Sequence, residues 1–113
     1  MTLRQGDGER EIITHTGPLW RWTTDKAPAA WFFVTIDGEA GEVLSATALM
    51  HRLETGRRAG FGSLKVIAQI GDSSFSTSVF RSKNTGWMLP VKAAIRKAEG
   101  LTEGDSVTVL LET

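Results

Sequence analysis

The stretch GRRAGFGS, which ends at Ser63, holds the residues best suited to binding an anion. Arg57 and Arg58 carry permanent positive charge, and the backbone amides around Gly60, Gly62 and Ser63 could converge on an oxyanion. The stretch lacks the phosphate-binding pattern G-x-x-x-x-G-K-[ST], and it leads into a strand rather than a helix. The same residues also fit a structural role, in which the arginines face the negative end of a preceding helix and the glycines form a turn.

Four tryptophans in 113 residues form a second group that could bind a ligand. Trp20 and Trp22 lie two residues apart, so an extended backbone places both side chains on one face and Arg21 on the other. Together with Trp31 and Trp87 they could line an apolar pocket, although aromatic side chains in small β-domains more often fill the core or cover its rim. An exposed apolar patch around Trp20 or Trp87 would instead indicate a protein-interaction surface.

Basic residues along the chain raise the alternative of nucleic-acid binding, provided that the fold gathers them on one surface. The chain has 13 Lys and Arg against 13 Asp and Glu, so its net charge is zero, whereas nucleic-acid-binding proteins usually carry a basic excess. The residues that such a surface would use are Arg57, Arg58, Arg81, Lys92 and Arg96.

Arg96 also has a structural interpretation. It lies four residues after Lys92, so the two side chains share one face of a helix. A carboxylate at Glu99 or Asp105 could hold its guanidinium in a fixed pair. We favour this structural pairing over direct contact with nucleic acid.

The sequence offers little for catalysis or for metal binding. His15 and His51 lack the His/Glu spacing of a zinc site, and the chain has no cysteine to supply a thiolate. Ser63 and the serines at 74, 76 and 78 stand in no nucleophile-elbow motif. We therefore expect no enzymatic activity, no metal and no cofactor.

The length of the chain corresponds to one domain over residues 1–113, with the barrel at about 11–112. Residues 1–10 are the only stretch that reads as disordered. No apolar run approaches the ~20 residues that span a bilayer, and the first residues contain no apolar signal-peptide region. We expect a soluble cytoplasmic protein.

Apolar and polar residues alternate along most of the chain, which is typical of strands. Gly17–Pro18 is predicted to break the first extended stretch. The alternate apolar residues of 62–71 are predicted to share one face of their strand, as are those of 106–112. The predicted strands cover residues 9–16, 18–22, 31–36, 62–71, 75–81, 87–89 and 106–112.

Helical spacing of apolar residues predicts two short helices, at about 38–55 and 90–99. Asp37 is the expected N-cap of the first helix. Pro90 is expected at the first position of the second helix, and Gly100 is expected to end it in the left-handed conformation. Within the first helix, the apolar residues at helical spacing are Val43, Ala46, Met50 and Leu53.

The segment GWMLPVKAAIRKAEGLTEGDSVTVLLE resembles the swapped-hairpin barrel proteins such as the AbrB and MazE transcription factors. Those proteins share its order of proline, helix with an outward arginine, glycine, Gly-Asp and strand. The resemblance implies a barrel, which the AbrB group forms by dimerising. It also carries the nucleic-acid alternative, by analogy of fold alone.

A more specific resemblance covers the chain from about Gly17 to the C-terminus, through PLWRW, AAWFFVTI, GRRAGFGSLKV, TSVFRSK, LPVKAAIRKAEGL and GDSV. These segments are similar to a family of small, mainly bacterial domains of unknown function, DUF1905. The resemblance implies a mainly β fold, a double-split β-barrel formed within one chain, with the two helices capping its ends. It supplies no catalytic residues.

These observations favour a non-catalytic module that binds a small ligand or an anion, or that mediates a protein interaction. A monomer is expected, with a small molecule or a protein as partner, no membrane association, and nucleic acid as the disfavoured alternative. The candidate binding residues are Arg57, Arg58, Gly60, Gly62, Ser63, Trp20 and Trp22.

Overall fold

The structure, a computed structural model, describes residues 12–25, 30–55, 62–82 and 86–113. Six antiparallel strands close into a barrel in the order β1-β2-β5-β4-β3-β6, and two helices lie outside the strands. This architecture confirms the mainly β barrel and the two helices predicted from the sequence. The elements are β1 (Ile12–Trp22), β2 (Trp31–Ile36), α1 (Gly38–Thr55), β3 (Ser63–Ile70), β4 (Ser73–Arg81), β5 (Trp87–Pro90), α2 (Ala93–Glu99) and β6 (Ser106–Glu112).

The first strand is continuous, so the predicted break at Gly17–Pro18 is wrong. Residues 12–18 of β1 pair with β6, and residues 19–22 pair with β2. Pro18 therefore lies where the strand changes partner. A proline at such a junction removes little from the hydrogen-bonded ladder, because it is not in the middle of either pairing.

Alternation along the strands fills the barrel, as the sequence predicts. Strand β3 alternates exposed and buried residues from end to end, and β6 does so over most of its length. Because alternate side chains point to opposite faces of a strand, each strand gives one apolar row to the interior. The rows of these two strands are Leu64, Val66, Ala68 and Ile70, and Val107, Val109 and Leu111.

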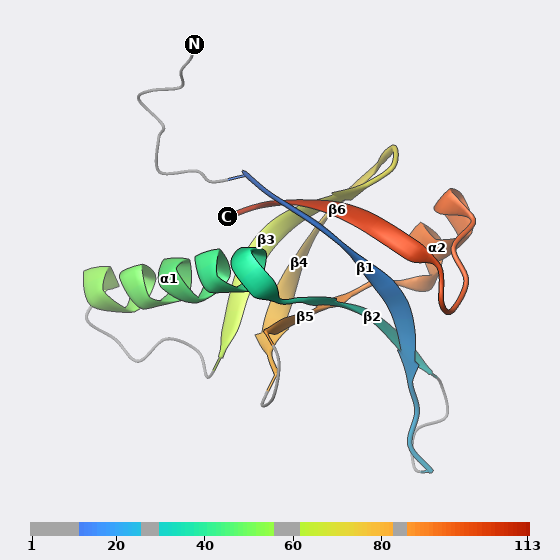
Figure 1. The fold of residues 1–113 in the computed structure, drawn as a ribbon, viewed down its shortest axis with the longest axis horizontal. Helices are drawn as coiled ribbons and strands as arrows, with labels where there is room; N and C mark the ends of the chain where they lie inside the picture. The colour runs from blue at the N-terminus through green and yellow to red at the C-terminus, as the bar shows by residue number, and fades with distance from the viewer. Residues whose placement is uncertain (1–11, 26–29, 56–61, 83–85) are drawn as a thin grey trace.

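Helix α1 packs on the barrel only through its first turns. Asp37 directly precedes the helix, and its carbonyl oxygen accepts the first helical hydrogen bond, from the N–H of Gly41 (3.1 Å). Leu44 is fully buried, whereas Met50 is 54% and Leu53 is 68% exposed. These last two residues have helical spacing but are not buried, because the C-terminal half of α1 extends past the strands (Figure 1).

Helix α2 is shorter than predicted, because it starts at Ala93 rather than at Pro90. Pro90 is instead the last residue of β5, opposite Phe33 of β2. The next residue, Val91, is buried, and its N–H bonds to the carbonyl oxygen of Phe32 (2.9 Å), which continues the pairing beyond the strand.

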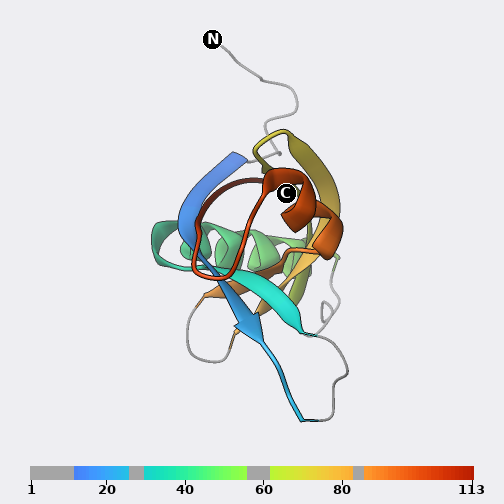
Figure 2. The same cartoon turned by 90° about the vertical axis from the view of Figure 1, so that its right-hand side faces the viewer.

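The prediction for the end of α2 is confirmed. Gly100 is left-handed, with φ 66°, and its N–H faces the carbonyl oxygens of the last turn. Leu101 then packs back against the core. Figure 2 views the molecule from the α2 side, with α1 on the far side of the strands. The two helices thus lie at opposite ends of the molecule (Figure 1).

Candidate functional site

A groove of about 360 Å³ separates α1 from the strands beside it. One wall is the face of α1 that carries Ser45, Leu49 and Arg52, at i, i+4 and i+7. The other wall comes from the start of β3, the end of β4 and the start of β5. We call this site the arginine groove; its lining residues are Ser45, Ala46, Ala48, Leu49, Arg52, Gly62, Ser63, Arg81 and Trp87.

The floor of the arginine groove holds Arg81 in place. Arg81 and Trp87 are partners across the β4–β5 pairing, and the guanidinium carbon of Arg81 lies 5.0 Å from the ring centroid of Trp87. The Trp87 ring is buried, and its Nε1 donates to Ser45 Oγ (3.1 Å). Arg81 Nη2 donates to the same oxygen (3.3 Å). Strand pairing, a cation–π contact and a shared hydroxyl therefore fix this cation.

Ser45 is left with a hydrogen-bond donor of its own. A serine hydroxyl has one proton and two acceptor positions. Since Trp87 and Arg81 both donate to Ser45 Oγ, the acceptor positions are filled and the hydroxyl proton remains to be donated. The centre of the groove thus offers guanidinium and hydroxyl donors side by side.

The described charged residues that line the arginine groove are all positive. Two of its described lining residues, Arg52 and Arg81, are arginines, and none of its described lining residues is Asp or Glu. Leu49 and its alanine neighbours add an apolar wall. Such a combination suits an anionic group attached to an apolar body, because a guanidinium binds a carboxylate or phosphate through paired N–H donors.

The predicted glycine-rich stretch reaches this groove only in part. Gly62 and Ser63 line it, and the carbonyl oxygen of Gly62 accepts a hydrogen bond from the backbone N–H of Arg81 (2.7 Å). Gly62 has φ 81°, a conformation that favours glycine. The other predicted residues of this stretch, Arg57, Arg58 and Gly60, lie outside the described residues.

Sequence reasoning missed Ser45 and Arg52 as site residues. The signal was present as the i, i+7 spacing of a hydroxyl and a cation on one helix face. That spacing acquires meaning only when the end of β4 is placed against this face. Arg81 was singled out for nucleic-acid binding, and the structure places it instead in the arginine groove.

Among the described residues, the four tryptophans do not come together in one place. Trp87 belongs to the buried core, while Trp22 and Trp31 are largely exposed. Trp20 lies on the outer face of the β1–β2 pair, where its Nε1 donates to Thr35 Oγ1 (2.9 Å). Leu19, the residue before Trp20, points into the barrel, so alternation along β1 turns Trp20 and Trp22 outward.

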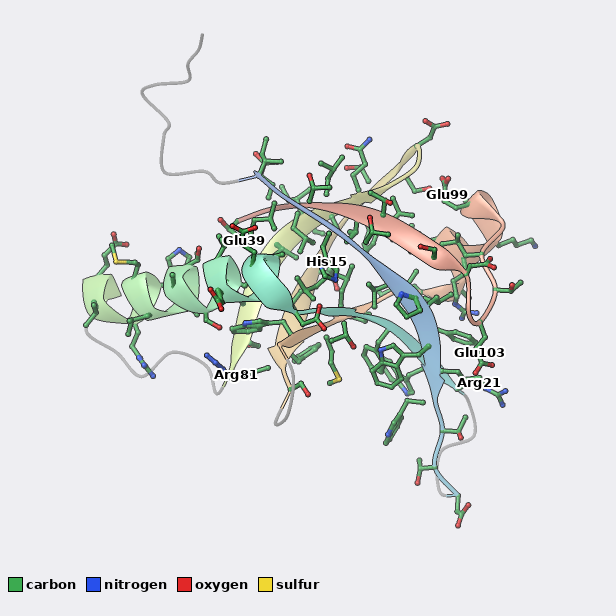
Figure 3. The ribbon with its side chains drawn as sticks, in the orientation of Figure 1. His15, Arg21, Glu39, Arg81, Glu99 and Glu103 are labelled. Carbon is green, nitrogen blue, oxygen red and sulfur yellow. The ribbon has the colours of Figure 1, made fainter. Side chains whose placement is uncertain are left out.

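The described basic residues do not form one patch. Arg81 lies beside α1 (Figure 3), whereas Arg96 lies in α2 and Lys92 directly precedes that helix, at the opposite end of the molecule. The guanidinium carbon of Arg96 lies 3.8 Å from the ring centroid of Phe32, and its Nε donates to the carbonyl oxygen of Val91 (3.2 Å). Arg96 thus has a structural partner, as favoured from the sequence.

That partner is not one of the two predicted carboxylates. Glu99 accepts a hydrogen bond from Ser73 Oγ (2.6 Å), and Asp105 accepts one from the N–H of Thr102 (2.8 Å). Both carboxylates therefore accept hydrogen bonds from residues next to turns, Ser73 and Thr102. The predicted pairing with Arg96 is wrong because Phe32, on the neighbouring strand, offers its ring face to the guanidinium.

A second groove, of about 480 Å³, lies between β1 and the start of α1. His15 borders it (Figure 3), and its Nε2 lies 3.5 Å from the Asp37 carboxylate. This groove is larger, but its described lining holds two carboxylates, Asp37 and Glu39, and no Lys or Arg, so it does not suit an anion. Among the described residues, no group of three or more His, Asp or Glu side chains could hold a metal ion.

Comparison with known proteins identifies the family. The family model described as a domain of unknown function, DUF1905, matches residues 15–111, which is most of the chain. No curated protein matches the chain. In the described part of the chain, neither helix combines the length and apolar character needed to cross a membrane. The chain therefore belongs to the DUF1905 family.

Proposed function

We propose that this DUF1905 protein is a non-catalytic binding module whose arginine groove holds a small organic anion with an apolar body. One observation carries the proposal. Arg81 is held against the buried ring of Trp87 and the hydroxyl of Ser45, in a groove whose described lining contains two arginines and no carboxylate.

The fixed guanidinium supports the anionic part of the proposal. A guanidinium has five N–H donors, and a single Nη2 bond to Ser45 leaves Arg81 with donors for a ligand. Because stacking on Trp87 already restricts the side chain, little rotamer freedom is lost when an anion binds. Arg52 adds a second positive charge from the facing helix.

The apolar wall supports the second part of the proposal. Leu49 is a large apolar residue that is 47% exposed, and it faces the groove together with Ala46 and Ala48. A volume of about 360 Å³ falls in the ~300–1,000 Å³ range of small-ligand sites. An aliphatic or aromatic acid would cover this wall while its carboxylate met the arginines.

The remaining expectations follow from the same module. We expect a monomer, because the six strands close the barrel within one chain and need no strand from a second copy. We expect a cytoplasmic protein, because the chain has no cysteine with which to form disulfides. Nucleic-acid binding by analogy to the AbrB group is disfavoured, because Arg81 and Arg96 lie at opposite ends of the molecule.

Isothermal titration calorimetry with octanoate and with its uncharged amide, octanamide, tests the proposal. We expect octanoate to bind at least about tenfold more tightly than octanamide, since charge-assisted hydrogen bonds contribute roughly 1.5–3 kcal/mol. Arg81→Gln should remove this preference. Arg21→Gln, which changes an arginine on the opposite side of the barrel from α1, should retain it.

Two outcomes would contradict the proposal. Equal affinity for acid and amide would show that the groove does not select charge. An unchanged preference in Arg81→Gln would place the anion elsewhere on the protein.

A further inference from the structure

A second surface lies away from the arginine groove, on the outside of the β1–β2 pair. Four aromatic side chains share it, because Trp20 is opposite Phe33 and Trp22 is opposite Trp31 in the strand register. The neighbouring pair in the register, Leu19 and Val34, is buried and points into the core. We call this surface the aromatic face; it consists of Trp20, Trp22, Trp31 and Phe33. The ends of the two strands that carry it reach beyond the rest of the barrel (Figure 1).

Two of the four side chains of the aromatic face are exposed, and three of its rings contact one another. Trp22 is 46% and Trp31 is 55% exposed. The rings of Trp31 and Phe33 are nearly parallel, at 11° with centroids 6.4 Å apart, and the Trp20 ring packs against Phe33 at 5.1 Å. The bond from Trp20 Nε1 to Thr35 fixes the base of this array. Exposed and preformed aromatic surface of this kind marks a docking site.

Hydrogen-bonding capacity defines the chemistry of the partner. The indole Nε1 groups of Trp22 and Trp31 have no hydrogen-bond partner among the residues that the structure describes. An indole N–H donates and does not accept. Arg21 alternates to the other side of β1, where it approaches Glu103 at 4.0 Å. The aromatic face is thus uncharged, apolar and rich in donors.

We propose that the aromatic face docks an extended, proline-rich segment of a partner protein. Proline has a carbonyl acceptor and no backbone N–H, so a run of prolines presents acceptors and apolar rings without leaving buried donors unpaired. In the polyproline II conformation its carbonyls make no internal hydrogen bonds, and aromatic-lined surfaces bind it by stacking and by donating to those carbonyls. Donor-rich aromatic rings and an acceptor-only chain are complementary.

Other occupants fit these features less well. Single-stranded nucleic acid would stack on the rings, but it also requires cations along its backbone, and the four residues of the face carry no charge. A second copy of the same face would bring indole donors against indole donors. This proposal is independent of the arginine groove, which lies against α1 and includes none of these four residues.

The indole N–H signals in a ¹⁵N–¹H NMR spectrum of the full chain test the proposal. We would titrate a blocked proline decamer, a glycine–serine decamer of the same length, and a thymidine decamer. The proline decamer should shift the Nε1 signals of Trp22 and Trp31 in a saturable way, and the Trp87 signal should stay in place. The glycine–serine decamer should shift none of them.

Two variants locate the site. Trp31→Ala and Trp22→Ala should each weaken binding of the proline decamer about tenfold, as expected for aromatic anchors of an interface. Leu110→Ala, which shortens an exposed apolar residue on β6, should leave it unchanged. An unmoved Trp87 signal confirms that each variant is folded. The proposal is overturned if the proline decamer shifts neither indole, or if the thymidine decamer shifts them at lower concentration.

Discussion

The arginine groove and the aromatic face use tryptophan in opposite ways. In the groove, Trp87 is 1% exposed, and its N–H is bound to Ser45, so the ring supports a cation. On the aromatic face, Trp22 and Trp31 are about half exposed, and the rings themselves are the surface. All three residues lie in strands of one barrel. The comparison shows that the side of the strand and the polar neighbour of the indole decide the role of the residue.

The two regions also differ in charge. The groove brings two arginines together without a carboxylate among its described lining residues, whereas the aromatic face carries no charge at all. A charged ligand and an uncharged one would therefore bind separately.

The largest difference is expected in stability. Trp87→Ala should lower the free energy of unfolding by about 3–5 kcal/mol, because it leaves a cavity in the core and removes the donor to Ser45. Trp22→Ala should change it by no more than about 0.5 kcal/mol, because that ring is half exposed. Urea denaturation followed by circular dichroism measures both. Equal losses would mean that the two tryptophans do not differ in burial as described.

A variant in one region is expected to weaken binding of that region's ligand only. Arg81→Gln should weaken octanoate binding about tenfold and leave proline-decamer binding unchanged, since the residue contributes charge to the groove alone. Trp31→Ala should weaken binding of the proline decamer and leave octanoate binding unchanged. Calorimetry of both ligands with both variants gives the four dissociation constants. Loss of both ligands from either variant would indicate one shared site.

Arg96 should behave as a structural arginine. Arg96→Gln should lower the free energy of unfolding by about 1 kcal/mol, because it removes the stacking on Phe32 and the bond to Val91. Neither ligand should bind less tightly. The matched change at Arg81 should alter anion binding more than stability, because that side chain is exposed. A loss of octanoate binding in Arg96→Gln would place an anion site at α2 instead.

The smallest expected difference between the two regions is in the salt dependence of ligand binding. Raising the salt concentration from about 0.01 M to about 0.15 M shortens the screening length from roughly 30 Å to roughly 8 Å. Octanoate binding should weaken by a few-fold, and proline-decamer binding should stay the same. Calorimetry at the two salt concentrations measures the change. Equal salt dependence of both ligands would contradict the difference in charge.

Local sequence patterns predicted much of the fold. Alternation identified the inward rows of β3 and β6, and the glycine at position 100 marked the end of α2. Errors came where burial depends on distant contacts. The helical spacing of Met50 and Leu53 was correct for a buried stripe, but nothing local says that the barrel ends before those residues are reached.

The candidate site was predictable only in parts. Gly62, Ser63 and Arg81 were each singled out, and Arg81 was assigned to a different function. Their convergence depends on the β4–β5 register, which sets Arg81 against Trp87, and on the placement of α1, which brings Ser45 to both. The strand register and the position of the helix are properties of the tertiary structure, which local sequence patterns do not determine. Residue types alone therefore showed a basic, glycine-rich stretch but could not show the groove.

The most direct test of the account is the ¹⁵N–¹H indole spectrum of the full chain during titration with octanoate. The Trp87 Nε1 group lies in the arginine groove and donates to the same oxygen as Arg81, so its signal reports on the proposed site. We predict a saturable shift of the Trp87 signal, with those of Trp22 and Trp31 unmoved, and a Trp87 shift in Arg81→Gln that needs about tenfold more octanoate. A shift confined to Trp22 and Trp31, or no shift of Trp87 at saturating octanoate, would contradict anion binding in the groove.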